Sequence, residues 1–436
     1  MIRAILITSW MLLAALPVRA MDIVEITSDG GLTAWLVTEP SIPMIAIDIE
    51  FIGGASLDPA DKQGATNLMA GLLEEGSRDL DSIGFAAAAE NLAARFSYDA
   101  GRDGVSISAT MLSENRDATI DLLAGALSEP TFGQVAVTRV KGQVLSNLRS
   151  EETDPNSIAG QEFAELTYGD HPYARRSDGT AATVSALTRQ DVIDAHRRSL
   201  VRSRAVIAIV GDITPDEAGP MIDRLLGGLP DTGPELPADA DISEASEITV
   251  VPLDTPQSVA IFGHSGIDRN DPEFMTAYLV SSILGGSGLD SRLKNEIREK
   301  RGLTYGIYSY LGSGRFGATY VGSVASANES MGEVVELVRA EWDRMVKDGI
   351  TEDELARTKR YLTGAYPLRF TGNAQIAGAL VGLQLADLPI DYIDTRNDQM
   401  NAITLDDVNK MARRLLKPDS LRFVIVGQPQ GLPQSD

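Results

Sequence analysis

The chain reads Thr188-Arg-Gln-Asp-Val192 and, 216 residues later, Thr404-Leu-Asp-Asp-Val408. Arg197-Arg198 and then an apolar run ending at Gly211 follow the first stretch, and Arg413-Arg414 and a run ending at Gly427 follow the second at the same spacing. Each Thr-x-x-Asp resembles a helix N-cap, and each run that follows predicts an amphipathic helix and then a buried strand. This order, found twice, predicts a duplicated chain.

The front ends of the two copies match more loosely. Ile45–Phe51 followed by Leu57-Asp58 corresponds to Ser258–Phe262 followed by Ile267-Asp268. Between the copies, the stretch from Leu229 to Asp241 is rich in Pro and Asp, a composition typical of linkers. The sequence therefore predicts an N-terminal domain over 21–230, a linker over 231–245 and a C-terminal domain over 246–436.

Each copy mixes strands and helices without regular alternation. Polar and apolar residues alternate over Val105–Met111, which predicts a half-buried strand of an antiparallel sheet. Apolar residues recur at helical spacing over 118–127, 135–149 and 352–362. The predicted class is α+β, with two homologous domains that each hold an antiparallel-rich sheet covered by helices on one face.

Composition excludes several functions. The chain has 436 residues, 43% of them apolar, and a formal charge of −24, as expected of a globular protein. Such a charge provides no attraction for nucleic acid or for an anionic membrane surface. An acidic cavity that prefers basic peptides is compatible with it. The absence of cysteine excludes disulfides and thiol catalysis.

The first twenty residues are typical of a signal peptide. A basic start at Arg3 precedes an apolar run from Ala4 to Leu16, and small residues before position 21 favour cleavage after Ala20. The run is short for a membrane span, and no later stretch reaches 18 apolar residues. We expect a periplasmic protein whose mature chain has no membrane span.

The segment Gly64–Gly76 predicts a helix that lacks the side chains a zinc site requires. Zinc peptidases with His-x-x-Glu-His use both histidines as ligands and the Glu to activate the zinc-bound water. Here the two histidine positions are Asn67 and Gly71, and the base position is Ala70. None of these side chains can do that chemistry.

Together with Gly169-Asp-His-Pro-Tyr173, Val210-Gly-Asp212 and the stretch from Leu284 to Tyr305, this helix makes nearly the whole mature chain resemble the pitrilysin/insulinase-type (inverzincin) zinc peptidases. The resemblance is to the bacterial branch whose members often work as heterodimers. In that family a Glu about 76 residues beyond the second His is the third zinc ligand. The corresponding residue here is Asn147, so all three ligand positions and the base position are vacant.

A second motif is complete. Arg298-Glu-Lys-Arg-Gly-Leu-Thr-Tyr305 matches every defined position of the Arg-Glu-x-x-Gly-Leu-x-Tyr pattern of that family. A helix carrying Leu289, Leu293 and Ile297 and ending at Gly302, followed by a strand over 305–310, would bring Arg298 and Tyr305 together. The resemblance implies that this pair reaches the peptide backbone opposite the zinc, where both can donate to a substrate carbonyl. The alternative is that Arg298 pairs with Glu299 or Glu296 and that Tyr305 packs in the sheet.

The three histidines of the chain, His171, His196 and His264, offer no substitute site. None has a second histidine or a carboxylate at ligand spacing. His171 lies in a turn that resembles a structural turn of the family. We therefore expect no metal in this chain, and zinc in a partner.

These observations favour a non-catalytic subunit of a heterodimeric zinc peptidase. Arg298 and Tyr305 would position unfolded peptides opposite the zinc site of a homologous partner that carries His-x-x-Glu-His. One rival is a structural or assembly subunit that resembles the core proteins of respiratory cytochrome bc complexes. A second is a self-sufficient hydrolase, although Gly286-Ser-Gly288 is too short for a Gly-x-Ser-x-Gly nucleophile site.

Overall fold

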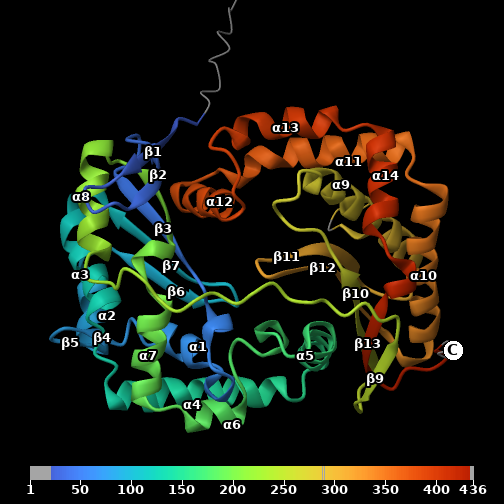
Figure 1. Ribbon diagram of the computed structural model, residues 1–436, viewed down its shortest axis with the longest axis horizontal. Coiled ribbons are helices and arrows are strands. Elements are labelled where there is room, and N and C mark those ends of the chain that lie inside the picture. The colour runs from blue at the N-terminus through green and yellow to red at the C-terminus, as the bar shows by residue number, and fades with distance from the viewer. Residues whose placement is uncertain (1–20, 287, 289, 433–436) are drawn as a thin grey trace, which may run out of the picture.

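A computed structural model describes residues 21–286, 288 and 290–432, which form two halves, each built around one large sheet. In Figure 1 the sheet of the first half lies on the left and that of the second half on the right. The predicted signal peptide, residues 1–20, lies outside the described residues. The predicted α+β class with two related domains is confirmed.

The first sheet has six strands in the order β1-β2-β8-β3-β7-β6. All neighbouring strands are antiparallel except β2 and β8, which are parallel. A short hairpin, β4 (Gly76–Ser77) with β5 (Leu80–Asp81), stands apart from it. The six strands are β1 (Ile23–Thr27), β2 (Thr33–Thr38), β3 (Met44–Ile52), β6 (Arg95–Ala100), β7 (Gly104–Leu112) and β8 (Ala205–Gly211).

The second sheet repeats this arrangement with one strand fewer. Its order is β11-β12-β10-β13-β9, in which β9 and β13 are parallel and the other pairs antiparallel. The order matches β6-β7-β3-β8-β2 of the first sheet strand for strand, as a duplication requires. Its strands are β9 (Ile248–Pro252), β10 (Gln257–Ser265), β11 (Ile307–Gly314), β12 (Gly317–Ala327) and β13 (Arg422–Gly427).

Helices cover one face of each sheet and form the two main cores with it. The first half contributes α1 (Ala65–Ala70), α2 (Ser82–Asn91), α3 (Arg116–Ser128), α4 (Gln134–Glu151), α6 (Ala181–Ala186), α7 (Arg189–Ser199) and α8 (Pro215–Leu226). The second contributes α9 (Phe274–Gly285), α10 (Met331–Asp348), α11 (Glu352–Ala365), α13 (Tyr392–Ala402) and α14 (Leu405–Leu415). Short 3₁₀ turns over 55–57, 60–62, 113–115, 172–174, 202–204, 328–330, 366–369 and 418–420 connect them.

The repeated Thr-x-x-Asp stretches form helix caps as predicted. The Thr188 hydroxyl accepts a hydrogen bond from the amide of Asp191, whose carboxylate in turn accepts from the Thr188 amide. Thr404 and Asp407 make the same reciprocal pair at the start of α14. These reciprocal Thr–Asp pairs provide acceptors for backbone N–H groups that have no partner within the first turn of a helix.

The other face of each sheet is covered by a helix from the opposite half. Helix α12 (Asn373–Leu385) packs Leu380 and Val381 against Val210 of the first sheet. Helix α5 (Pro155–Tyr168) packs Phe163 against Val424 of the second sheet. Figure 1 shows both helices between the two sheets, α12 beside the first and α5 beside the second. The exchange ties the halves together, and periodicity alone does not predict it.

The equivalent strands β8 and β13 end at glycines with the same backbone conformation. Gly211 has φ +142° and Gly427 has φ +143°, values that residues with a side chain rarely adopt. A Cβ atom at Gly211 would lie 2.1 Å from the carbonyl oxygen of Met44 on the neighbouring strand. The close approach explains why glycine ends both strands.

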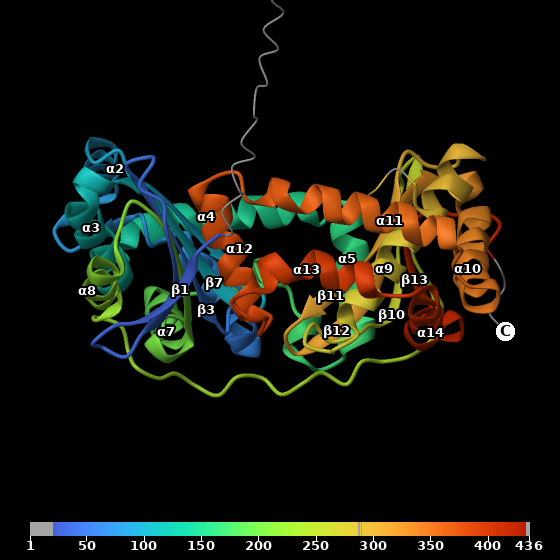
Figure 2. The same ribbon diagram turned by 90° about the horizontal axis from the view of Figure 1, so that it is seen from above.

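Helices α11 and α13 run side by side from the second half toward α12, as seen from above in Figure 2. The connection over 228–247 passes along the opposite side of the molecule without helix or strand. Among the described helices, none combines the length and apolarity that a membrane crossing requires.

Candidate functional site

Helix α1 carries Asn67 and Ala70, two of the positions predicted to correspond to the zinc motif, and it is anchored firmly. Gly64 precedes it with φ +86°, and the buried Asp58 carboxylate accepts hydrogen bonds from the Thr66 amide and hydroxyl at 3.2 and 2.7 Å. Arg198 of α7 completes the cluster with an ion pair to Asp58 at 2.7 Å. Burial raises the pKa of Asp58, and these hydrogen bonds and the Arg198 charge oppose that rise. These contacts fix the position of α1.

Of the positions predicted to have lost zinc chemistry, Gly71 lies next to helix α4. A Cβ atom on Gly71 would lie 3.4 Å from a methyl carbon of Val140, an ordinary contact, so the backbone leaves room for a side chain there. Asn147 is on α4, seven residues after Val140 and therefore on the same side of that helix. Asn67 is partly buried, Ala70 is buried and Asn147 is exposed. Helices α1 and α4 are in contact with each other.

The three histidines are held by hydrogen bonds. His171 Nε2 lies 2.9 Å from the carbonyl oxygen of Ala238, and its Nδ1 accepts from the Tyr173 amide. His196 Nε2 lies 2.6 Å from the carbonyl oxygen of Leu127, and burial lowers the pKa of His196. In the described parts of the chain, no three His, Cys, Asp or Glu residues gather in a way that could hold a metal ion.

His264 lies in the core of the second half. Trp342 Nε1 donates to its Nε2 at 3.1 Å, and its Nδ1 lies 2.7 Å from the carbonyl oxygen of Ser265. Because Nε2 accepts, the ring is neutral and its proton is on Nδ1. Burial lowers the pKa of His264 to about 4.

Arg298 lies in a π-helical segment, η6 (Lys294–Glu299), where the sequence predicts an α-helix. Leu293 and Ile297 are buried as predicted, whereas Leu289 lies outside the described residues. The turn that follows the segment contains Gly302, which has φ +65°. Such wide turns are frequent at functional sites.

Within the described residues, the charge of Arg298 has only one partner, and the contact is loose. Its Nε lies 3.5 Å from Glu299 Oε1, and both side chains are about half exposed, so this pair adds little stability. The carboxylate of Glu296 is occupied by Lys300 and Arg301 at 2.6 and 2.5 Å. The guanidinium of Arg298 is thus free to contact another molecule.

Tyr305 projects into solvent, with 90% of its surface exposed. It precedes strand β11, which begins at Ile307 and not at Tyr305 as predicted. The neighbouring Thr304 hydroxyl donates to the carbonyl oxygen of Ala325 on β12 at 2.7 Å and accepts from the Gly306 amide. Thr304 thereby fixes the loop that presents Tyr305, so the alternative in which Tyr305 packs in the sheet is wrong.

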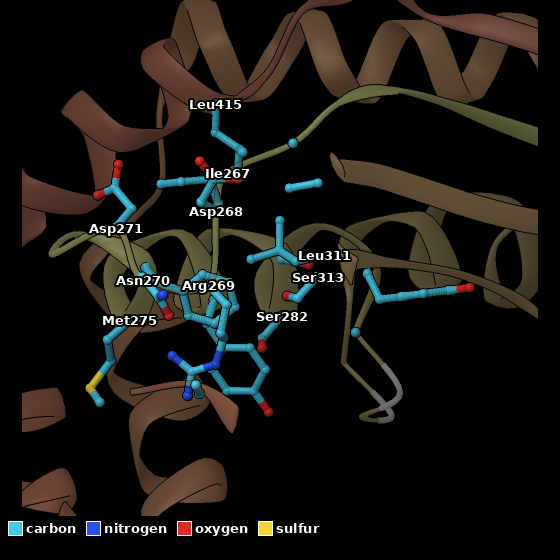
Figure 3. A pocket seen from close by; sticks show the side chains of 18 of the residues that line it. Ile267, Asp268, Arg269, Asn270, Asp271, Met275, Ser282, Leu311, Ser313 and Leu415 are labelled. Carbon is cyan, nitrogen blue, oxygen red and sulfur yellow. The ribbon is translucent and has the colours of Figure 1, made fainter. Parts of the chain in front are cut away.

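A cavity of about 1740 Å³ lies between the two halves. Its walls come mainly from the second half, with Glu50, Ile52 and Asp103 closing it on the first-half side. Figure 3 shows Arg269 and Asn270 among the side chains that line it, near Met275 and Ser282. Arg298 and Tyr305 do not line the cavity.

The cavity does not concentrate the acidity of the chain. Its lining holds seven carboxylates and six arginines, close to neutrality, whereas the whole chain carries −24. An acidic chamber is therefore not the explanation of the charge. Tyr308 and Tyr310 of β11 line it as well and stack with ring centroids 6.2 Å apart.

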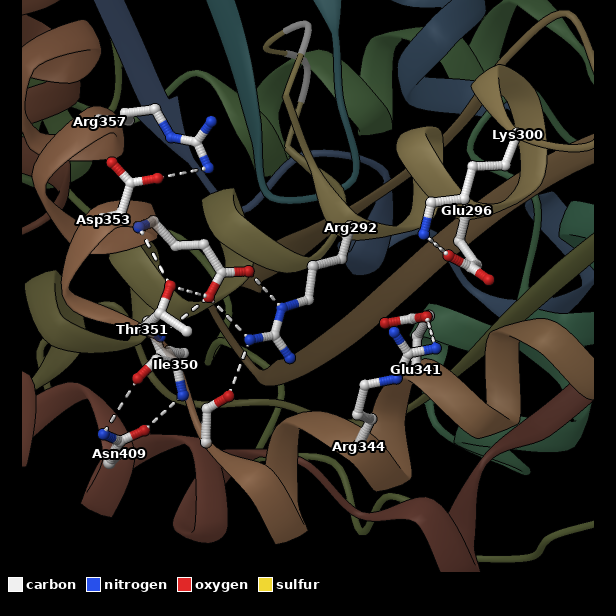
Figure 4. Close-up of polar contacts among 12 residues, drawn as sticks. Arg292, Glu296, Lys300, Glu341, Arg344, Ile350, Thr351, Asp353, Arg357 and Asn409 are labelled. Atoms are coloured by element: carbon white, nitrogen blue, oxygen red, sulfur yellow. Dashed lines mark hydrogen bonds and ion pairs between the residues drawn. The ribbon is translucent and has the colours of Figure 1, made fainter.

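Several of these charges form a bonded network around the start of α11 (Figure 4). Arg292 donates to both carboxylate oxygens of Glu354 at 2.6 and 2.8 Å, and Glu354 also accepts from the Thr351 amide. Burial alone would raise the pKa of Glu354, but these hydrogen bonds hold it at about 2. The network fixes the position of α11.

Sequence reasoning missed the residues that line this cavity. Tyr308 and Tyr310 alternate in a strand, which places them on one face, and that spacing could have indicated a paired surface. Arg269, Arg369 and Arg396 are far apart in the chain, and no local pattern connects them.

Comparison with known proteins now decides the family. Residues 36–180 match the model described as "Insulinase (Peptidase family M16)", and residues 186–362 match the one described as "Peptidase M16 inactive domain". The chain belongs to the M16 peptidase family. The resemblance inferred from the vacated helix and the Arg/Tyr stretch is confirmed.

Relatives of this M16 chain include proteins named as peptidases and as non-peptidases. A "Non-peptidase homolog YmxG" of Helicobacter pylori is 25% identical over 385 residues, covering 88% of this chain and 89% of that protein. An uncharacterized zinc protease of Streptomyces coelicolor is 26% identical over 399 residues, covering 89% and 86%.

Solved structures agree on the fold. A peptidase M16 inactive domain from Pseudomonas fluorescens superposes with a TM-score of 0.87 at 28% identity, covering 95% of this chain and all of that one. A chain of complex III from Candida albicans has a TM-score of 0.77 at 16% identity, covering 95% and 98%, a likeness of fold alone. Residues 186–362 of this M16 chain thus match an inactive M16 domain.

Proposed function

We propose that this M16 chain is the non-catalytic subunit of a heterodimeric zinc peptidase in the periplasm. A homologous partner with an intact His-x-x-Glu-His supplies the zinc, the water and the base. This chain contributes Arg298 and Tyr305, which hold an unfolded peptide opposite that zinc. The partner also offers a sheet edge to which the peptide adds as a strand.

The observation that carries the proposal is the state of the Arg/Tyr pair. Tyr305 is 90% exposed on a loop fixed by Thr304, and Arg298 is held only by a half-exposed contact to Glu299. Neither residue completes the core or the cavity of its own chain. Two donors presented outward suit the carbonyl of a peptide bound between two subunits.

The vacated helix supports the division of labour. Asn67, Ala70, Gly71 and Asn147 replace the three ligands and the base, yet α1 and α4 keep their packing. A helix that packs normally but has no zinc ligands fits a subunit that contributes its fold while the partner binds the zinc.

The test uses the complex with the zinc-bearing partner and an unstructured fluorogenic peptide. Arg298→Ala and Tyr305→Phe should each lower kcat by about 100-fold, the effect of losing one donor to developing charge. Arg360→Ala, an exposed arginine on α11, should leave kcat unchanged. Full turnover in both variants would refute the proposed role.

Localisation and cleavage need a separate measurement. The chain recovered from a periplasmic fraction should begin at Met21, as read by N-terminal sequencing. A chain that stays in the cytoplasmic fraction with residues 1–20 attached would contradict this part of the proposal.

The second candidate is a structural or assembly subunit, which the fold likeness to a complex III chain favours. Under that function the partner would need this chain for solubility or assembly but not for turnover. A complex that forms normally and keeps full activity with Arg298 and Tyr305 both replaced by Ala would favour this candidate.

A further inference from the structure

Glu296 is a buried carboxylate inside the π-helical segment η6 that also carries Arg298. The residue is 7% exposed and lies two positions before Arg298 in the chain. Its Oε2 accepts a hydrogen bond from Lys300 Nζ at 2.6 Å, the contact drawn in Figure 4, and its Oε1 accepts from Arg301 Nη1 at 2.5 Å. The same Arg301 nitrogen also donates to the Glu296 carbonyl oxygen at 2.9 Å. Glu296 thus joins the residues before Arg298 to the residues after it.

These contacts fit the wide turn of a π-helix. An α-helix rotates by about 100° per residue, so residue i+4 lies close to residue i, whereas residue i+5 points about 140° away from it. A π-helical turn closes between residues i and i+5. Here the Lys300 amide donates to the carbonyl oxygen of Asn295, five residues earlier, at 3.0 Å. The wider turn brings Lys300 and Arg301, at i+4 and i+5, to the same carboxylate.

Burial makes these contacts stronger than an ordinary surface ion pair. The Glu296 side chain is only 10% exposed, so solvent screens its charge less than that of an exposed pair. The hydrogen bond from Lys300 is the main cause that lowers the pKa of Glu296, so the carboxylate is charged at neutral pH. A buried carboxylate that loses its partners costs free energy, because it has also given up water. The contacts therefore favour the wide turn over a regular α-helical one.

The same turn sets the direction of Arg298. Side chains two residues apart in a helix point to roughly opposite sides, and accordingly Glu296 is buried while the Arg298 side chain is 44% exposed. The Gly302 amide donates to the Arg298 carbonyl oxygen at 2.9 Å, which ties the turn to the loop that carries Tyr305. A change in the turn would therefore move Arg298 relative to Tyr305.

We propose that Glu296 is the positioning residue of Arg298. Its carboxylate binds Lys300 and Arg301 and thereby holds the π-helical turn that points Arg298 outward. This inference rests on the proposed function, because Glu296 acts on the substrate only through Arg298. It adds a buried residue that sets kcat without contacting the peptide. The rival explanation is that Glu296 only stabilises the fold of the second half.

The first measurement is amide hydrogen exchange of the chain alone, read by mass spectrometry over residues 294–305. Glu296→Gln keeps the size of the side chain, but its amide has one acceptor oxygen and one NH2 donor, and the donor then faces one of the two cations. Losing a hydrogen bond between charged groups should speed exchange in this segment by at least about 10-fold and leave α10 unchanged. Unchanged exchange over 294–305, or an equal acceleration in α10, would overturn the proposal.

The second measurement is a double-mutant cycle on kcat in the complex with the zinc-bearing partner. Glu296→Gln should lower kcat by about 10-fold, because misplacing a catalytic group by about 1 Å costs up to about 100-fold. In the Arg298→Ala background the same replacement should cause no further loss, since Glu296 acts only through Arg298. An equal loss in both backgrounds would favour the rival explanation and overturn the positioning role.

A second variant and a control keep the test independent of one substitution. Arg301→Gln removes one of the two contacts from the other side, and the fold should tolerate it because the Arg301 side chain is 35% exposed. It should show the same faster exchange and the same dependence on Arg298. Asp343→Asn removes a half-exposed pair with Lys347 on α10 and should change neither quantity. An Arg301→Gln variant that behaves like Asp343→Asn would refute the proposal.

The two proposals fail separately. Faster exchange in Glu296→Gln, with no kcat effect of Arg298→Ala or Tyr305→Phe, would refute the catalytic role of the pair and support the hold of Glu296 on the turn. A loss of kcat in Arg298→Ala, with unchanged exchange and kcat in Glu296→Gln, would refute only the role of Glu296.

Discussion

His264 should make the stability of the second half depend on pH. Burial lowers the pKa of this histidine from its ordinary 6.5 to about 4 in the folded chain. Because protonation then favours the unfolded chain, the stabilising effect is full above pH 6.5 and is lost as the pH falls from 6.5 toward 4. The shift corresponds to about 3 kcal/mol in total, of which about 2 kcal/mol is lost by pH 5.

The measurement is urea unfolding at pH 7.5 and pH 5 in a chain that starts at residue 21 and carries Trp35→Phe. Trp342, which donates to His264, is then the one tryptophan from residue 21 onward, and its fluorescence is excited selectively at about 295 nm, where tyrosine no longer absorbs. His264→Gln cannot gain the proton, so its unfolding free energy should approach that of the parent by about 2 kcal/mol between pH 7.5 and pH 5.

Val338→Ala is the matched control. Val338 is fully buried in the same core and does not titrate, so the difference from the parent should be the same at both pH values. A gap between His264→Gln and the parent that stays constant with pH would refute the neutral, buried state of His264.

Two further predictions concern the duplicated architecture. Gly211→Ala should destabilise the first half by about 3 kcal/mol or more, because the backbone there has φ +142° and a Cβ would lie 2.1 Å from the Met44 carbonyl oxygen. The control is Gly142→Ala on α4, where a Cβ meets open space, and it should stabilise the first half by about 0.5–1 kcal/mol. Thermal unfolding measures both variants, and equal shifts of the melting temperature would contradict this account. Leu380→Ala on α12 should lower the free energy of unfolding by about 2–5 kcal/mol, since Leu380 is fully buried against the sheet of the other half. It should also expose the 366–372 connection to limited proteolysis. A cleavage pattern unchanged from the parent would mean that α12 does not hold the halves together.

Local patterns of the sequence were enough for the fold. The Thr188 and Thr404 caps, the alternating strand at Val105–Met111 and the amphipathic helices are set by residues close together in the chain, so periodicity reveals them. The vacant ligand positions stay a prediction from residue type and spacing, on which zinc chemistry depends.

Tertiary structure alone decided the rest. The exchange of α5 and α12 between the halves depends on which apolar surfaces remain uncovered after each sheet has packed its own helices. The π-helical turn at Arg298 and the outward position of Tyr305 depend on anchors such as the Thr304 bond to Ala325. Arg269, Arg369 and Arg396 line one cavity only because segments distant in sequence fold around it, and residues brought together in that way leave no periodic signal in the chain.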